Sequence, residues 1–172
     1  MARRGAVRGG FRRAQGSPGN GVRMEIETTR FGKLEINEER IITFPKGLLG
    51  FPSHKRFALI QTGDQNYFFW LQSLDDPGLA FVVTDPAIFF RDYEFALRED
   101  SQQELGLSDA SEAQILIICN KVGEYLTGNL QGPLVINAAS RVAQQVVLND
   151  RRFSTRQPLF RLQGGLPLAR SA

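Results

Sequence analysis

Two single residues, a cysteine and a histidine, are the first places to look for chemistry in this sequence. Cys119 lies in the apolar run 114–119, and His54 lies far from it along the chain in a segment rich in proline and glycine. A zinc site or a Cys–His dyad needs further ligands or a close partner, and no second cysteine or histidine is present. We therefore expect Cys119 to be a small buried residue of the core and His54 a surface residue of a loop.

The adjacent carboxylates Asp75 and Asp76 are the other candidates, as metal ligands or as an acid–base pair. Pro77 and Gly78 follow them directly. Aspartate, proline and glycine are the residues that tight turns favour, so the four residues predict a turn between two strands.

Motifs of the common enzyme classes are missing from the sequence. It contains no glycine-rich phosphate loop, no GxSxG, no HExxH and no paired CxxC. We expect no catalytic, cofactor-binding or metal-binding residue, and we interpret the protein as a binding module, not an enzyme.

The positive charge of the chain is concentrated at its beginning. The formal net charge is +3 over 172 residues, but residues 1–23 hold six arginines and no acid. The remaining residues, 24–172, carry fifteen basic and eighteen acidic side chains, a net charge of −3. These counts do not predict a basic surface for nucleic acid on the folded part.

Both ends of the chain differ in composition from its middle. Residues 1–23 are rich in glycine and arginine and poor in large apolar side chains, so we expect a disordered extension. It is either a dispensable extension or a product of start-codon choice, an arm that touches RNA, or an amphipathic targeting peptide. Residues 161–172 are expected to form a flexible tail. No apolar run approaches the ~20 residues that a membrane span requires.

Between these ends the sequence predicts short strands. Two apolar runs, 68–71 and 79–83, flank the turn at Asp75–Gly78 and predict a central hairpin that contains the only tryptophan, Trp70. The run 115–119 is apolar on both faces, which is typical of a central strand, and 134–137 and 141–149 continue the pattern.

Two short helical pieces complete the expected fold. Asp85 and Pro86 are typical of the start of a helical turn, and Ser101 to Glu104 reads as a capping box ended by Gly106. The predicted fold is mostly β: a small antiparallel β-barrel-like domain over residues 24–160 with one or two short helices.

Five segments, in order and at matching spacing, resemble the flagellar assembly factor FliW family. They are residues 44–51, 70–86, 92–95, 129–137 and 144–149, and the resemblance covers about residues 24–160. It implies a cytoplasmic, non-enzymatic, barrel-like protein that is monomeric on its own and has no membrane or direct nucleic-acid partner. It also implies two protein partners, flagellin and the RNA-binding translational repressor CsrA. Flagellin held in the cytoplasm occupies the factor, and once flagellin is exported the freed factor captures CsrA and relieves repression of flagellin translation.

Polar and aromatic positions within or beside the matching segments are candidates for the partner surface. The candidates are Phe89, Phe90, Tyr93, Asn129, Gln131, Asn137 and Gln144. An alternative explains Asn129, Asn137 and Gln144 equally well, namely hydrogen bonds to the backbone at turns and bulges.

Two other functions remain open from the sequence. One is a barrel that binds a small ligand or a flavin. The other is an RNA-binding β domain that uses the arginine-rich extension.

Overall fold

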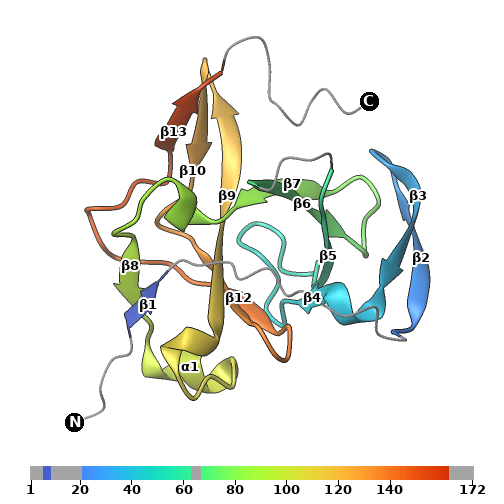
Figure 1. Ribbon diagram of the computed structural model, residues 1–172, viewed down its shortest axis with the longest axis horizontal. Helices are drawn as coiled ribbons and strands as arrows, with labels where there is room; N and C mark the ends of the chain where they lie inside the picture. Colours follow the sequence, from blue (N-terminus) through green and yellow to red (C-terminus); the bar gives the residue numbers. More distant parts are fainter. Residues whose placement is uncertain (1–5, 9–20, 63–66, 163–172) are drawn as a thin grey trace.

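One curved antiparallel sheet of nine strands runs through the centre of the molecule (Figure 1). The computed structural model describes residues 6–8, 21–62 and 67–162. Seven strands form a path in the order β12-β11-β9-β7-β6-β5-β4, and β10 and β13 extend it from β9. Two separate two-stranded ribbons, β1–β8 and β2–β3, flank the sheet.

The described elements follow one another in this order: β1 (Ala6–Arg8), β2 (Arg23–Thr28), β3 (Gly32–Asn37), η1 (Glu38–Arg40), β4 (Ile41–Thr43), β5 (Arg56–Ile60), β6 (Phe68–Ser73), β7 (Ala80–Thr84), η2 (Pro86–Ile88), β8 (Glu94–Ala96), α1 (Glu99–Glu104), η3 (Ala110–Glu112), β9 (Ala113–Val122), β10 (Tyr125–Gly128), β11 (Leu134–Asn137), β12 (Ala143–Gln145) and β13 (Gln157–Arg161).

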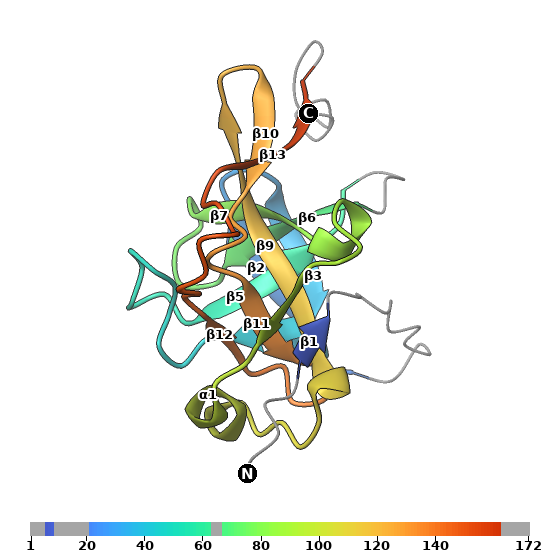
Figure 2. The ribbon, with the colours of Figure 1, turned by 90° about the vertical axis from the view of Figure 1, so that its left-hand side faces the viewer.

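Strand β9 is the longest of these strands and joins the hydrophobic clusters. It pairs with β11, then β7 and then β10 along its length, and Figure 2 shows it crossing the whole molecule. Successive side chains of a strand point to opposite faces. Ile115 and Ile117 accordingly enter one cluster and Leu116 enters another, and all three are fully buried. The predicted central strand is confirmed, and its two apolar faces explain why.

The predicted central hairpin is also confirmed, as β6 and β7. Its turn is held by side chains: Ser73 Oγ accepts from the amides of Asp75 and Asp76 at 3.1 and 3.0 Å. The fully buried Gln72 donates from Nε2 to carbonyls of the same turn, among them Leu79 at 3.1 Å. Asp75 and Asp76 thus belong to a turn, as the sequence indicated.

The mostly β, antiparallel fold is confirmed, and its sheets are open rather than closed into a barrel. The edge strands β4 and β12 come together only at one isolated parallel bridge between Thr43 and Val142. Pro45 follows closely, and proline has no N–H with which to continue a ladder. With only one bridge, and with no N–H at Pro45 to donate a further bond, the edges of β4 and β12 stay apart.

Several boundaries differ from the sequence prediction. Ala6–Arg8 forms a strand on β8 within the extension expected to be disordered, and Val7 is buried there opposite Phe95. The rest of that expectation, residues 1–5 and 9–20, lies outside the described residues. Arg161 ends strand β13 instead of beginning a tail, and the expectation for 163–172 again lies outside the described part.

The predicted capping box is wrong. Helix α1 begins at Glu99, and its N-cap residue, Arg98, makes no side-chain capping bond. Ser101 lies inside the helix and is buried, so its hydroxyl is not at the helix start. The helix end is as predicted, because Gly106 follows the C-cap with φ of +66°.

The turn between β6 and β7 predicts a pH-dependent stability. Asp75 Oδ2 accepts from the amides of Lys55 and Arg56 at 3.0 and 3.2 Å, and the first of these bonds lowers the pKa of the carboxyl most. A lowered folded-state pKa gives stability that is present above the ordinary carboxyl pKa near 4 and is lost as the pH falls. We expect Asp75→Asn to lower the unfolding free energy by about 1 kcal/mol at pH 7 and by almost nothing at pH 2.5.

Asp92→Asn, which makes the same charge change at an exposed aspartate outside the turn, is the control for that measurement. Chemical denaturation at both pH values measures the unfolding free energy of each variant. If the loss caused by Asp75→Asn were as large at pH 2.5 as at pH 7, the ionised carboxylate would not be its cause.

Candidate functional site

The gap between the two sheet edges is the candidate site, and we call it the seam. It consists of residues 43–47, which leave β4, and residues 141–145, which enter and form β12. At its closed end the amide of Thr43 donates to the carbonyl of Arg141 at 3.0 Å. Beyond that bond the two segments diverge.

A tight loop after β4 turns that segment away from β12. The amide of Gly47 donates to the carbonyl of Phe44 at 2.9 Å, with φ of +67° at Gly47. A Cβ at this position would lie 2.4 Å from the carbonyl oxygen of Phe51, so only glycine fits. Leu48 is buried, and the amide of the exposed Leu49 donates to Gln145 Oε1 at 2.9 Å. The loop is thus packed and is tied to β12 by the side chain of Gln145.

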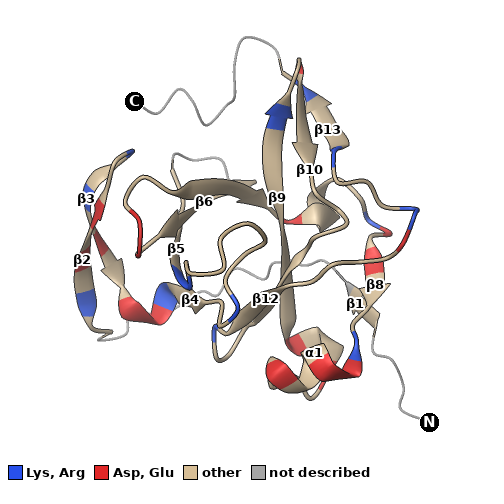
Figure 3. Ribbon diagram, turned by 180° about the vertical axis from the view of Figure 1, so that it is seen from behind, with Lys and Arg blue, Asp and Glu red and all other residues tan. Residues whose placement is uncertain are grey.

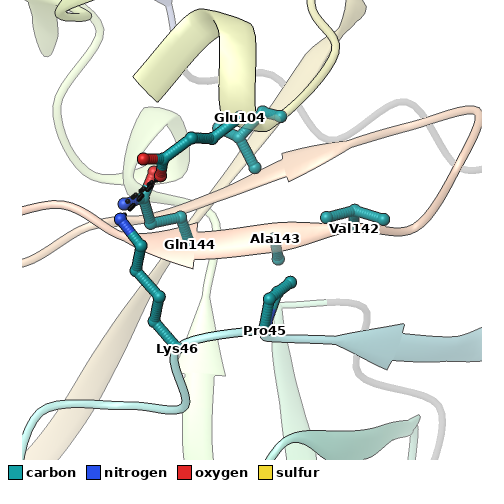
Figure 4. Close-up of a pocket in the computed structure, with 7 residues that line it drawn as sticks. Pro45, Lys46, Glu104, Val142, Ala143 and Gln144 are labelled. Atoms are coloured by element: carbon teal, nitrogen blue, oxygen red, sulfur yellow. Dashed lines mark hydrogen bonds and ion pairs between the residues drawn. The ribbon is translucent and has the colours of Figure 1, made fainter. Parts of the chain in front are cut away.

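A cavity of about 240 Å³ occupies the open part of the seam (Figure 4). Its lining residues are Pro45, Lys46, Glu104, Leu105, Val142, Ala143 and Gln144. Lys46 Nζ lies 2.7 Å from Glu104 Oε2, and Gln144 Nε2 donates to the same oxygen at 3.3 Å. The lining therefore combines an apolar floor with one polar corner between α1 and the loop.

Arg141 stands at the closed end of the seam in an unusual backbone conformation. Its φ is 63°, in the left-handed region that costs a side chain with a Cβ about 1 kcal/mol or more. Its side chain is half-buried, and the pKa of the guanidinium is lowered first by burial and then by the neighbouring Arg40. Among the described residues no carboxylate forms an ion pair with either arginine.

Asn137 fixes the hairpin that holds Arg141 in that conformation. Its Oδ1 accepts from the amides of Ala139 and Ser140 at 3.0 and 3.2 Å, and its Nδ2 donates to the carbonyl of Leu105 at 2.8 Å. Its carbonyl accepts from the amide of Arg141 at 2.9 Å. One buried side chain thus joins the β11–β12 hairpin to the end of α1.

The residues first considered for chemistry do not form a reactive site. Cys119 is buried, as predicted, and burial raises the pKa of its thiol to about 12, so the thiol stays protonated. His54 lies in the loop before β5, half-buried with its ring against Phe51. Over residues 6–8, 21–62 and 67–162, no cluster of three His, Cys, Asp or Glu side chains is placed to hold a metal ion. None of the helices in the described part of the chain has the length and apolar character needed to cross a membrane.

The aromatic candidates for the partner surface lie away from the seam. Phe89 is half-buried and stacks on Phe160, with the two ring centroids 6.2 Å apart. Phe90 packs at the margin of the hydrophobic cluster that contains Tyr93 and Ile115. Tyr93 was expected on the surface but is buried, and its hydroxyl donates to the carbonyl of Leu130 at 2.7 Å. Burial raises the pKa of this phenol. The ring packs in the core against Phe95 and Phe153, with ring centroids 5.7 and 5.0 Å away.

The polar candidates divide between turns and the seam. Asn129 Oδ1 accepts from the amides of Gln131 and Gly132 at 3.1 and 2.9 Å, which makes it a turn residue. Gln131 Nε2 donates to the carbonyl of Asp150 at 3.4 Å. Asn137 was also expected on the surface and is buried, for the bonds described above. Only Gln144 lines the cavity, so the structure does not bring the seven candidates into one surface.

Sequence reasoning missed Pro45, Lys46, Glu104 and Arg141 as a group. Pro45 does signal the end of a strand, but the residue that it faces across the seam is about a hundred positions away. Arg141 gave no signal, because arginine is not typical of the left-handed region.

Comparisons with known proteins agree with one another. The model of a family described as FliW protein matches residues 25–159. The flagellar assembly factor FliW of Magnetococcus marinus is 42% identical over 140 residues, which cover 80% of this chain and 85% of that protein. The one from Natranaerobius thermophilus is 40% identical over 148 residues, 82% of this chain and 95% of that protein. A crystal structure of the flagellar assembly factor FliW matches with a TM-score of 0.73 and 34% identity, over 80% of this chain and 97% of that chain.

The bonds of Asn137 predict a stability effect. We expect Asn137→Ala to lower the unfolding free energy by about 2 kcal/mol, because it leaves the carbonyl of Leu105 and two turn amides without their partner. Asn129→Ala, which removes two acceptor bonds but no donor bond to a buried carbonyl, should cost about half as much. Urea denaturation of both variants measures the difference. Equal losses would mean that the bond to α1 contributes nothing.

Proposed function

The chain belongs to the FliW family, and on that premise we propose that it is a non-enzymatic flagellar assembly factor that acts by binding flagellin and CsrA. The observation that carries the proposal is the family match over residues 25–159, a range that includes all of the central sheet except the end of β13. The similar proteins are themselves named flagellar assembly factors.

The proposed mechanism is a switch between two partners in the cytoplasm. Flagellin that has not yet been exported occupies the protein and leaves CsrA free to repress flagellin translation. Export of flagellin releases the protein, which then captures CsrA, and translation resumes. A small domain that is monomeric on its own is sufficient for this exchange, because the state of the switch depends only on which of the two partners the domain has bound.

The geometry of the described chain is more compatible with partner binding than with the rival functions. The cavity of about 240 Å³ is below the ~300–1,000 Å³ typical of small-molecule sites, so this cavity does not suit a flavin. The buried, protonated Cys119 offers no nucleophile.

Charge supports a protein partner that itself binds RNA. Residues 24–172 carry a net charge of −3, and a protein that binds RNA presents a basic surface. Complementary charge speeds the encounter of two proteins and disfavours wrong partners. The same acidic balance disfavours direct binding of nucleic acid by the folded domain.

Five of the candidate surface residues are half-buried and so remain partly accessible. They are Phe89, Phe90, Asn129, Gln131 and Gln144. We retain them as candidates for partner contact, whereas Tyr93 and Asn137 are buried.

Binding of the purified full chain to flagellin and CsrA from the same bacterium tests the proposal. We expect both proteins to form complexes in isothermal titration, and added flagellin to displace CsrA from the preformed complex, because the switch requires that one partner exclude the other. Repeating the titrations with residues 1–23 deleted separates the domain from the arginine-rich extension.

Absence of both complexes would contradict the proposed function. A stable complex of all three proteins would contradict the switch while leaving the binding intact. Tight RNA binding that disappears with residues 1–23 would favour the RNA-binding alternative.

A further inference from the structure

We propose that the seam is a docking site for an extended, acidic segment of a partner protein, which adds as a strand to the free edge of β12 and places a carboxylate on Arg141. The inference rests on the proposed function, since a protein that works by binding partners needs a surface that recognises them. It goes beyond that function in assigning the place and the chemistry of recognition.

The backbone of β12 supplies the edge. The amide of Asn137 donates to the carbonyl of Val142, and the amide of Val146 donates to the carbonyl of Pro133. In an antiparallel ladder these bonds recur at every second residue, so Ala143 and Gln145 direct their backbone groups away from β11. Ala143 is buried beside the bridge to Thr43, so the part of the edge that another chain can reach begins at the half-buried Gln145. Past the bridge at Thr43, none of the described strands lies on that side of β12. A free strand edge of this kind is a template for another chain.

The cavity beside the edge favours apolar side chains in the segment that binds there. Its floor is formed by Pro45, Leu105, Val142 and Ala143, and its volume of about 240 Å³ accommodates one or two apolar side chains. In Figure 4, Pro45 faces Ala143 across the opening, and Lys46 and Glu104 meet at one end of it. Side chains of an added strand alternate between its two faces. A segment that alternates apolar and acidic residues therefore fits.

Arg141 gives the seam its preference for negative charge. Its guanidinium is half-buried, lies near Arg40 and has no carboxylate partner among the described residues. Lys46 is already neutralised by Glu104, and Glu38 and Glu39 flank Arg40 along the chain without forming an ion pair with either arginine. In Figure 3 basic segments lie beside β4, β5 and β12, within a domain of net negative charge. A carboxylate from a partner would satisfy the desolvated guanidinium through paired hydrogen bonds.

The conformation of Arg141 indicates that its side chain is kept for a purpose other than folding. Glycine would relieve the strain at a φ of 63°, and the hairpin itself is held by Asn137. Strained positions of this sort concentrate at binding sites. Phosphate groups of RNA would also attract two arginines, but they would use neither the strand edge nor the apolar floor.

A synthetic peptide tests the proposal. The probe is a fluorescein-labelled hexapeptide of alternating valine and glutamate with capped ends, titrated with the full chain and followed by fluorescence anisotropy. We expect a dissociation constant below about 1 mM. The same peptide with N-methyl groups on alternate amides cannot pair with the edge and should bind at least ten-fold more weakly. A hexapeptide of alternating glycine and glutamate has the same charge without apolar side chains, and it should also bind at least ten-fold more weakly.

Variants of the protein separate the seam from general electrostatics. Arg141→Gly should weaken the valine–glutamate peptide at least ten-fold and leave the melting temperature unchanged or higher. Arg91→Gly is the matched control, because Arg91 is an exposed arginine outside the seam, and it should have no effect on binding. Equal binding of the three peptides, or an Arg141→Gly protein that binds like the original, overturns the proposal. A short poly-uridine RNA that binds through Arg141 while the peptide does not overturns it in favour of nucleic acid.

Failure of this proposal is distinguishable from failure of the proposed function. If the peptide results are as expected and neither flagellin nor CsrA binds, the docking site stands and the proposed function falls. If flagellin and CsrA bind and the peptide does not, the proposed function stands and the docking site falls.

Discussion

Burial of both faces of β9 is the constraint on which the rest of the structure depends. Ile115 and Ile117 fill one side of the sheet and Leu116 fills the other, so covering elements must lie on both sides. The path from β4 to β12 curls around Leu116, and the β1–β8 ribbon and the segments near Tyr93 cover the opposite side. A sheet that curls around a core brings its two edges together. The position of the seam is therefore a consequence of how β9 is buried.

The seam is where this curling stops short of closure. One bridge joins Thr43 to Val142, and Pro45 and Gly47 then turn the chain away. An open edge is usually a liability, because it recruits other strands without selection. Here the edge is short, and it is bordered by a packed loop, by the pair Lys46–Glu104 and by Arg141. For a member of a family of assembly factors, an edge restricted in this way is suited to recognising one kind of segment.

Local chemistry determined which parts of the fold could be predicted. The β6–β7 hairpin could be predicted because Asp75, Asp76 and Pro77 specify their own turn. Strand β9 could be predicted because both its faces are apolar. The burial of Val7 could not be predicted, because a Gly- and Arg-rich segment gives no sign that Val7 pairs with Phe95. The capping box failed because the helix begins at Glu99, which places Ser101 inside the helix and not at its start. The candidate site was missed for the same physical reason: Thr43 and Val142 meet only through the topology, and the conformation of Arg141 is imposed by Asn137.

Hydrogen–deuterium exchange of the full chain, alone and saturated with flagellin or with CsrA, tests most directly the central claim that the protein works through the open edge of its sheet. The account predicts that at least one partner slows exchange in residues 43–49 and 141–146, while β9, already protected by its pairing with β11, β7 and β10, stays unchanged. Binding of both partners with no added protection in these two segments would contradict it.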